Sequence, residues 1–366
     1  MIQPAPMRQP RSEKRSMTIS PPSRAKNFAS DNWSGICPEA LEALIAANTG
    51  HVHAYGEDEY TRKACDLLRD FFECDCEVYF TFNGTAANSL ALASLTRSYH
   101  SILCHDLAHV ETDECGAPEF FSNGTKVLLL PGAGGKIDLG AVHDKVERRK
   151  DIHYPKPRVL SLTQATELGT VYDISELRAA KETATRHGLH IHMDGSRFPN
   201  AAASLGCAPR EISWEAGVDV LCLGGTKSGL PVGEAVVFFN RELAAEFDYR
   251  CKQAGQLASK MRFLTAPWLG VLESGAYLKY AAHANACAEA LAQGLAKIPG
   301  ITIRHPRQAN SVFVALPPAV AEGLQARGWC FYAFIGEGGA RFMCSWDTEM
   351  ADVEALCADV GELASQ

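Results

Sequence analysis

The chain has 366 residues, of which 46% are hydrophobic, 21% charged and 8% aromatic. These values lie near the averages of globular proteins and exclude a disordered chain, a collagen-like repeat and a coiled coil. The formal net charge is −8 and the basic residues beyond the N-terminus are dispersed among acids, which argues against a nucleic acid partner. No apolar stretch reaches the roughly 20 residues of a membrane-spanning helix, so we expect no membrane partner.

The cysteines and the chain length indicate the compartment and the number of domains. There are 13 cysteines, an odd number without a repeated C-x-x-C pair or an apolar leader, and this pattern predicts free thiols in a reducing cytoplasm. The length predicts one large domain and a smaller one. We expect a flexible arm over 1–27, a large domain over 28–265 and a small domain over 266–366.

From residue 28 onward, short β-rich runs alternate with helical runs. Helices are expected first at 38–49, which begins at a proline and ends before a glycine, and at 61–72. The strands expected next are 77–82, 101–104, 126–130, 158–162, 189–193, 218–223 and 234–239, with helices at 87–95, 139–149 and 174–187. This alternation predicts an α/β domain with a largely parallel sheet. The elements expected beyond residue 241 are helices at 267–296, 319–328 and the C-terminus, and strands at 302–303, 312–315 and 340–344, which together form a small α+β domain.

Ligands of such sheets bind beyond the carboxyl ends of the strands, and three strand-end loops carry suitable residues. The first loop leads from Phe82-Asn83 into Gly84, Thr85 and a helix of small residues. Backbone N–H groups at the start of a helix favour an anion such as phosphate. Taken alone, this loop is equally consistent with a plain N-cap at Thr85 and no ligand.

The second loop contains Asp194 and Arg197 and follows a predicted strand. A carboxylate in the sheet crevice is costly to bury unless a cation or a protonated nitrogen faces it. A helix cap or an internal Asp–Arg ion pair is the alternative. His190 and His192 share one face of the same strand, but no third ligand is near, so we expect packed histidines and no metal site.

The third loop places Lys227 among glycines and hydroxyl residues at the end of another apolar strand. A partly desolvated lysine can lose its proton and form a Schiff base with an aldehyde, whereas a solvated surface lysine is the alternative. A phosphate loop, a carboxylate for a pyridinium nitrogen and an amine for an imine are together the parts that pyridoxal 5'-phosphate requires. We therefore predict this cofactor.

The sequence resembles the L-threonine aldolases of the low-specificity and phenylserine type, from about residue 30 to the C-terminus. The stretches that carry the resemblance are Ser30-Asp31-Asn32, Tyr55-Gly56-Glu57-Asp58, Asn83-Gly84-Thr85-Ala86-Ala87-Asn88, HVETDECGAPE at 109–119, Gln164-Ala165-Thr166-Glu167, HMDGSR at 192–197, Thr226-Lys227 and Ser259-Lys260-Met261-Arg262. The family implies pyridoxal phosphate fold type I, the aspartate-aminotransferase-like fold. We therefore expect a large domain with a mostly parallel seven-stranded sheet and a small C-terminal α+β domain.

The resemblance also implies a role for each residue of the cofactor site. Lys227 holds the cofactor covalently, and Asp194 keeps the pyridine nitrogen protonated. The Gly84-Thr85 loop binds the phosphate. His109 stacks on the ring, and Arg197 donates to the phenolic oxygen.

For the substrate, the resemblance implies that Ser30 and Arg341 bind the carboxylate, a task to which a guanidinium is suited. Arg262, with Lys260 beside it, resembles a phosphate-binding residue donated by a neighbouring subunit, and Tyr55 resembles a residue that lines the partner's site. We therefore expect a homo-oligomer, a dimer or a tetramer, with shared active sites.

His153 and Glu114 resemble groups that act near the β-hydroxyl of the substrate, the first as a histidine close to it and the second as an acid that positions water. The sequence leaves the choice of base open between them. Phe82-Asn83 stands where many relatives have Pro-Thr, and the stretch after the lysine also departs from the family. Neither departure removes a catalytic atom, but both leave the substrate preference open.

The implied reaction is retro-aldol cleavage of L-threonine, L-allo-threonine or phenylserine-type β-hydroxy-α-amino acids to glycine and an aldehyde, so we expect a carbon–carbon lyase. Another lyase or a transferase of the same fold, such as a β-eliminase or an aminotransferase, is the alternative. A scaffold without activity would have no reason to keep Lys227, Asp194 and His109 together. A nicotinamide site at Gly132-Ala133-Gly134-Gly135 lacks the strand–helix unit and the downstream acid that it requires.

Overall fold

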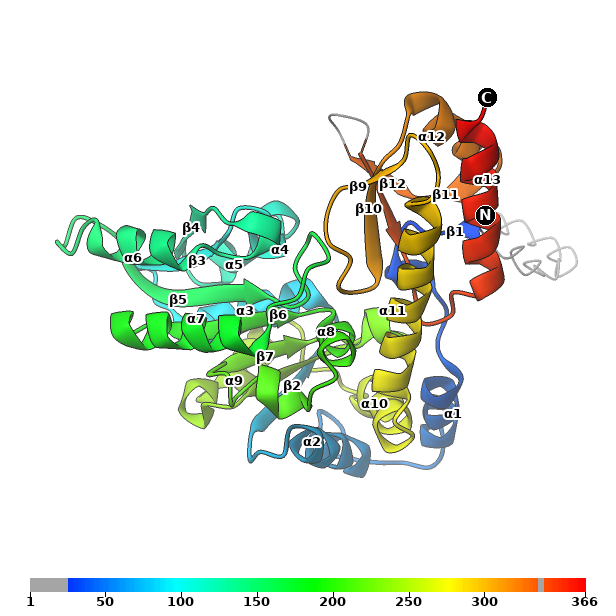
Figure 1. The fold of residues 1–366 in the computed structure, drawn as a ribbon. Helices are drawn as coiled ribbons and strands as arrows, with labels where there is room; N and C mark the ends of the chain where they lie inside the picture. The colour runs from blue at the N-terminus through cyan, green and yellow to red at the C-terminus, as the bar shows by residue number, and fades with distance from the viewer. Residues whose placement is uncertain (1–25, 335–338) are drawn as a thin grey trace, which may run out of the picture.

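A seven-stranded sheet forms the centre of the larger part of the computed structural model, which describes residues 26–334 and 339–366 (Figure 1). The strand order is β2-β8-β7-β6-β5-β3-β4. The strands are β2 (Glu77–Thr81), β3 (His100–His105), β4 (Lys126–Leu130), β5 (Lys156–Thr163), β6 (His190–Gly195), β7 (Val220–Leu223) and β8 (Glu234–Phe238). In this sheet β8 runs antiparallel to both of its neighbours, whereas the pairs from β7 through to β4 are parallel. The predicted, mostly parallel sheet is confirmed.

Helices cover both faces of the sheet, because successive side chains of a strand point to opposite sides. In β7, Leu221 and Leu223 pack into one apolar cluster, whereas Val220 and Cys222 pack into another. The helices on the first face are α1 (Pro38–Ala47), α2 (Glu59–Phe72), α6 (Leu139–Glu147), α7 (Ile174–His187), α8 (Phe198–Leu205) and α10 (Arg262–Glu273). The helices on the second face are α3 (Gly84–Leu95), α4 (His109–Thr112), α5 (Ala117–Phe121) and α9 (Phe247–Gln253). The result is a three-layer α/β domain.

Local sequence signals explain where several of these elements begin and end. All four residues of β7 are buried, which is typical of a parallel strand covered on both faces. Helix α7 begins with a capping box in which Asp173 and Glu176 each accept a hydrogen bond from the other's backbone N–H. It ends at Gly188, whose φ of 62° lies in the left-handed region that favours glycine.

The C-terminal part is a smaller α+β unit, as predicted. Its antiparallel sheet has the order β12-β13-β10-β9. The strands are β9 (Thr302–Ile303), β10 (Ser311–Ala315), β12 (Tyr332–Phe334) and β13 (Gly339–Met343), and the helices are α11 (Ala276–Leu295), α12 (Pro318–Ala326) and α13 (Met350–Ala364). These helices share an apolar cluster with the sheet, which they cover on the side drawn to the right in Figure 1.

The helix predicted over 267–296 is two helices in the structure. Helix α10 ends at Glu273 and α11 begins at Ala276, and Gly275 between them has a φ of +71°. A glycine at this position lets the chain change direction. Helix α10 packs against α1 and α2, whereas α11 continues into the small unit. The predicted domain boundary at 265 therefore falls inside a helix that packs on the large domain.

The end of the predicted N-terminal arm is part of a strand. Lys26–Asn27 forms β1, which pairs in parallel with β11 (Trp329–Cys330) of the small unit. The next residue, Phe28, is buried in the apolar cluster of the small unit, although the predicted boundaries placed it in the large domain. The last two residues of the predicted arm are therefore part of a strand, and the rest of it, 1–25, lies outside the described residues.

Short 3-10 helices complete the described chain. They are η1 (Asp31–Trp33), η2 (Ala133–Gly135), η3 (Pro209–Ile212), η4 (Thr226–Ser228) and η5 (Arg241–Ala244). All 13 cysteines lie in the described residues and are free thiols, as predicted. None of the helices in 26–334 and 339–366 has the length and apolar character needed to cross a membrane.

Candidate active site

Most of the predicted site residues meet at the edge of the sheet where the parallel strands end. Asp194 is the residue before Gly195, the last residue of β6. Lys227 lies in η4, shortly after β7. Helix α3 begins at Gly84, after β2, and His109 begins α4, after β3. The carboxyl ends of parallel strands share one edge, so residues far apart in the sequence come together there.

Asp194 is a buried carboxylate that the surrounding groups keep charged. It is 3% exposed, and its Oδ1 accepts hydrogen bonds from the Ser196 backbone N (3.0 Å) and Oγ (2.8 Å). Burial acts to raise the pKa of Asp194, but the charges of Lys227 and His109 and the bonds from Ser196 outweigh burial and lower that pKa. A charged carboxylate at this depth is suited to face a protonated ring nitrogen.

His109, Glu114 and Asn88 continue the network from Asp194. The Nδ1 of His109 lies 2.9 Å from Glu114 Oε1, and the Asn88 amide donates to Glu114 Oε1 and to Asp194 Oδ2, each at 2.9 Å. The hydrogen bond to Glu114 raises the pKa of His109, and burial raises the pKa of Glu114. Both shifts favour a proton in the hydrogen bond between the imidazole and the carboxyl group.

Asn88 is a site residue to which we assigned no role from the sequence. It is buried on α3, one turn after Gly84. An amide among the alanines and leucines of this buried helix was the available signal, because a buried polar side chain requires a partner. Its partners, Glu114 and Asp194, are 26 and 106 residues away in the sequence, so only the fold identifies them.

Two hydrogen bonds from neighbouring elements hold the loop that carries Lys227. Gly225 N donates to the Glu234 carboxyl group at 2.5 Å, and Tyr277 Oη donates to Gly224 O at 2.6 Å. A Cβ at Gly224 would lie 2.3 Å from the backbone oxygen of Ser196, so only glycine allows this close approach to the loop after β6. Burial raises the pKa of Glu234 to about 7.

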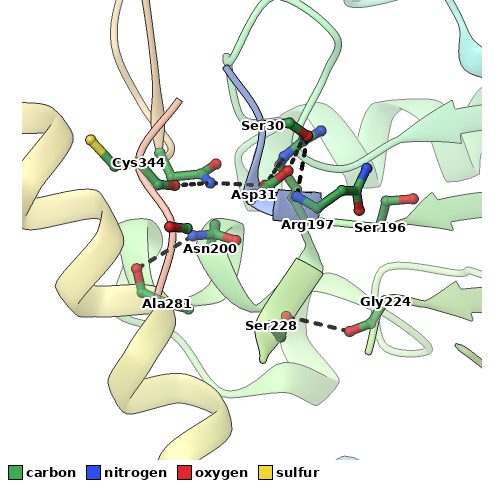
Figure 2. Close-up of polar contacts among 12 residues, drawn as sticks. Ser30, Asp31, Ser196, Arg197, Asn200, Gly224, Ser228, Ala281 and Cys344 are labelled. Carbon is green, nitrogen blue, oxygen red and sulfur yellow. Dashed lines mark hydrogen bonds and ion pairs between the residues drawn. The ribbon is translucent and has the colours of Figure 1, made fainter. Parts of the chain in front are cut away.

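Arg197 is paired with Asp31, and Figure 2 shows the two side chains facing each other beside Ser30. The guanidinium Nε and Nη2 donate to the two carboxylate oxygens at 2.8 and 2.9 Å. The Asn310 amide donates to the same carboxylate at 3.1 Å. Burial acts to raise the pKa of Asp31, but Arg197 and Lys227 outweigh burial and lower that pKa. The internal Asp194–Arg197 ion pair, our alternative for this loop, was therefore wrong, because Arg197 is paired with Asp31.

Arg341 and Ser30 come together from opposite ends of the chain. Arg341 lies in β13, and its Nη2 donates to the backbone oxygen of Ala29 at 3.3 Å, next to Ser30. The guanidinium also lies 5.0 Å from the centre of the Tyr332 ring. Burial and the charge of Arg197 lower the pKa of Arg341. The two guanidiniums are therefore close enough to repel each other. Two cations in one partly buried region favour an anion between them.

The phosphate loop begins helix α3, but its cap differs from the expected one. The N-cap is Asn83, whose Oδ1 accepts from Ala86 N at 2.9 Å, so an N-cap at Thr85 was wrong. Gly84 and Thr85 form the first turn of the helix. A Cβ at Gly84 would lie 4.0 Å from Ser196 Oγ, which places this turn beside the loop that follows Asp194. Free N–H groups there can bind a phosphate.

Within one chain, the structure does not bring His153 to this site. His153 is exposed in the turn before β5, at the amino end of that strand, whereas the site lies at the carboxyl ends. The eight residues of β5 separate the two edges by roughly 25 Å. His153 therefore contacts neither Glu114 nor His109 in this chain.

Tyr55 and Arg262 lie in a second group at the surface, in which Tyr55 is exposed and Arg262 is half-buried. Tyr55 N donates to Ser259 O at 3.1 Å, and the Tyr55 ring lies 4.7 Å from Lys252 Nζ. Arg262 donates to Thr49 O at 3.0 Å. Two segments more than 200 residues apart in the sequence thus form one basic surface group with an exposed tyrosine.

Two weaker sequence signals have structural explanations. His192 is buried with its Nδ1 2.9 Å from Ser161 Oγ, and burial lowers its pKa to about 4, as expected for a packed histidine. The glycines of 132–135 form a tight turn, because a Cβ at Gly132 would lie 1.6 Å from the backbone oxygen of Lys136. This turn leads into η2 and does not begin a long helix.

The donor set fits pyridoxal 5'-phosphate. Asn88 Oδ1 and Glu114 Oε2 are buried and have no hydrogen-bond partner among the described residues. Protein atoms alone therefore do not satisfy the polar groups beside Asp194. A helix start for a phosphate, an anion for a ring nitrogen and the Lys227 amine for an aldehyde lie along one edge. The fold and this site define an α/β enzyme of pyridoxal phosphate fold type I.

Comparisons with known proteins agree with this class. Residues 27–317 match the family described as beta-eliminating lyase. The low specificity L-threonine aldolase of Pseudomonas aeruginosa is 62% identical over 335 residues, which cover 92% of this chain and 97% of that protein. A threonine aldolase of Leishmania major has a similar structure, with a TM-score of 0.87, 26% identity and coverage of 92% of this chain and 99% of that one. A methionine aminotransferase of Escherichia coli is similar in fold alone, with a TM-score of 0.72, 14% identity and coverage of 93% of this chain and 94% of that one.

The chain belongs to the beta-eliminating lyase family, and within it to the group of the low specificity L-threonine aldolases. The predicted resemblance and the aminotransferase-like fold are confirmed. Because this family depends on pyridoxal phosphate, the predicted cofactor is confirmed as well.

Proposed function

We propose that this protein cleaves L-threonine, L-allo-threonine and phenylserine-type β-hydroxy-α-amino acids to glycine and an aldehyde. The observation that carries the proposal is the buried network of Asp194, Asn88, Glu114 and His109 at the same sheet edge as Lys227. The identity to a low specificity L-threonine aldolase supports the same reaction.

The cofactor, when bound, supplies a positively charged ring that accepts the electrons of the breaking Cα–Cβ bond. The Lys227 amine would hold its aldehyde carbon, and the N-terminus of α3 at Gly84 and Thr85 would bind its phosphate. Asp194 stabilises a proton on the ring nitrogen, because its own pKa is lowered and it stays anionic. Arg197, oriented by the ion pair with Asp31, would donate to the phenolic oxygen.

Ser30 and Arg341 bind the substrate carboxylate in this proposal. Arg341 donates to the carbonyl of Ala29, the residue that precedes Ser30. A fixed carboxylate orients the Cα–Cβ bond relative to the ring, and the bond held perpendicular to the ring is the one that breaks. The carboxylate site therefore selects the reaction as much as the base does.

The His109–Glu114 pair is the group best placed to handle protons. The β-hydroxyl must lose its proton as the aldehyde forms, and Cα must gain one to give glycine. His109 contacts Glu114 and is half-exposed, whereas the unpartnered Oε2 of Glu114 is buried. We infer that His109 lies against the ring and that Glu114, directly or through a water, accepts the hydroxyl proton.

We also propose a homo-oligomer in which Tyr55 and Arg262 complete the site of a neighbouring subunit. The support is that Tyr55 is exposed and Arg262 half-buried at the surface, outside the network around Asp194. Lys252 lies against the Tyr55 ring, and Lys260 is exposed two residues before Arg262. A phosphate at the edge of the neighbouring site suits such a basic surface. The free thiols support our expectation of a cytoplasmic location.

The test of the proposed reaction is the pair Lys227→Ala and Lys126→Ala. Lys126 is exposed at the amino end of β4, so its loss changes charge by the same amount far from the site. We expect Lys126→Ala to keep the visible cofactor absorption, borohydride labelling and benzaldehyde release from phenylserine. Lys227→Ala should lose the labelling and lose turnover by about 10³-fold or more.

An outcome in which Lys227→Ala keeps normal turnover without added amine would contradict the proposal. The alternative reactions of the fold are separated by their products. An aminotransferase forms a 2-oxo acid and a β-eliminase releases ammonia, whereas the proposed cleavage yields glycine and benzaldehyde in equal amounts.

A further inference from the structure

Two histidines and a glutamate meet where helices α6 and α7 lie side by side (Figure 1). His143 and Glu147 are one turn apart on α6, so their side chains share a face. His187 is the last residue of α7. One ligand atom from each of the three side chains lies within 4.8 Å of the other two.

We propose that His143, Glu147 and His187 bind a zinc ion that links the two helices. Zinc takes histidine nitrogens at about 2.0–2.1 Å in tetrahedral geometry, which places two such nitrogens roughly 3.3–3.4 Å apart. The Nδ1 of His143 lies 3.3 Å from the Nε2 of His187. Two imidazoles and a carboxylate, with water as the fourth ligand, form a donor set that zinc accepts.

The groups around the three side chains prepare them for a metal. Glu147 binds Lys150 Nζ through Oε2 at 2.5 Å. Its Oε1 lies 3.6 Å from Nδ1 of His187, the neighbouring ring nitrogen to the Nε2 that faces His143. A carboxylate held by a second group in this way is already oriented.

The site is separate from the cofactor site. Helix α7 ends at His187, just before the amino end of β6, and α6 ends before the turn that leads to β5. The three side chains therefore lie toward the amino edge of the sheet, opposite the edge that carries Lys227. Lys150 and Arg186 add positive charge nearby, so we expect the affinity for zinc to depend strongly on the carboxylate of Glu147.

The experiment titrates zinc into the cofactor-loaded protein against a chromophoric chelator, with a phosphine reductant present. The variants are His143→Ala and Glu147→Gln, and the matched control is Asp144→Asn, which removes an exposed carboxylate from the same helix. Cysteines elsewhere can bind zinc, so the difference between proteins is the measured quantity. The wild type and Asp144→Asn should bind one more equivalent than His143→Ala, and Glu147→Gln should bind that equivalent at least about tenfold more weakly.

Thermal unfolding supplies the second measurement, because a metal bound only to the folded state raises the melting temperature. Zinc should raise the melting temperature of the wild type and of Asp144→Asn, and not that of His143→Ala. Equal stoichiometry and affinity in the wild type and His143→Ala would overturn the proposal. A zinc-induced rise that persists in His143→Ala would overturn it as well.

Discussion

Asp31 is the residue that joins the two halves of the site electrostatically. It is 1% exposed and accepts hydrogen bonds from Arg197, which follows β6, and from Asn310, which precedes β10. The charge of Lys227 also lowers its pKa. One carboxylate thus balances cations of the large domain and binds an amide of the small unit, and its removal leaves a buried guanidinium without its anion.

Asp31→Asn should lower the free energy of unfolding by about 3–5 kcal/mol, because breaking a buried ion pair leaves an uncompensated charge. Urea unfolding of the cofactor-free protein measures the change. The control is Asp66→Asn, which removes the ion pair with Arg69 on the surface, where screening leaves little to lose. A loss no larger than that of the control would show that Asp31 does not carry this balance.

Strand β8 shows how the direction of one element changes the chemistry of the site. Its neighbours end at the site edge, but β8 begins there, so its first residue, Glu234, lies under the Lys227 loop. Glu234 accepts from Gly225 N and is buried. A parallel strand would have placed this carboxyl group at the opposite edge, where it could not hold the loop.

Glu234→Gln should change how stability depends on pH. Burial raises the pKa of Glu234 from 4.5 to about 7, so the folded protein binds this proton more tightly than the unfolded chain. The free energy of unfolding therefore falls as the pH rises from about 4.5 to about 7. Glutamine keeps an oxygen that can accept from Gly225 N but has no proton to lose, so the variant should lack this part of the fall.

Urea unfolding of the cofactor-free protein between pH 4.5 and pH 8 tests this prediction. The fall attributable to Glu234 is on the order of 3 kcal/mol. Glu242→Gln, in the exposed turn after the same strand, serves as the control and should follow the wild type. Identical pH profiles for Glu234→Gln and the wild type would contradict the assignment.

At the scale of the whole molecule, the site extends beyond the large domain. Phe28 packs in the core of the small unit while the next residues, Ser30 and Asp31, reach the site. Arg341 contributes from β13 of the small unit. In the proposed function, the relative position of the two units therefore sets the carboxylate site, and the surface with Tyr55 and Arg262 is where we propose that a second copy of the chain binds.

Mixing two inactive variants tests the shared site. If Lys227 of one subunit works with Arg262 of its neighbour, a heterodimer of Lys227→Ala and Arg262→Ala contains one site with both native residues. Random exchange into dimers should restore about a quarter of the wild-type activity. Lys227→Ala mixed with Asp194→Ala is the control and should stay inactive, because both residues belong to one chain's site.

Exchange is verified by capturing differently tagged subunits together. Recovery in the first mixture but not in the control supports the shared site. Captured hetero-oligomers that show no recovery in either mixture would refute the contribution of Arg262 from a neighbouring subunit.

The sequence by itself determined the elements and the loops that carry Lys227, Asp194 and Gly84, because caps, hydrophobic periods and strand-end motifs are local. The tertiary structure alone decided which side chains meet. Asp31 and Arg197 are 166 residues apart, and Asn88 joins Asp194 across 106 residues. The direction of β8 and the distance of His153 from the site also follow from strand pairing. Such contacts depend on how the layers pack, and no local pattern in the chain encodes them.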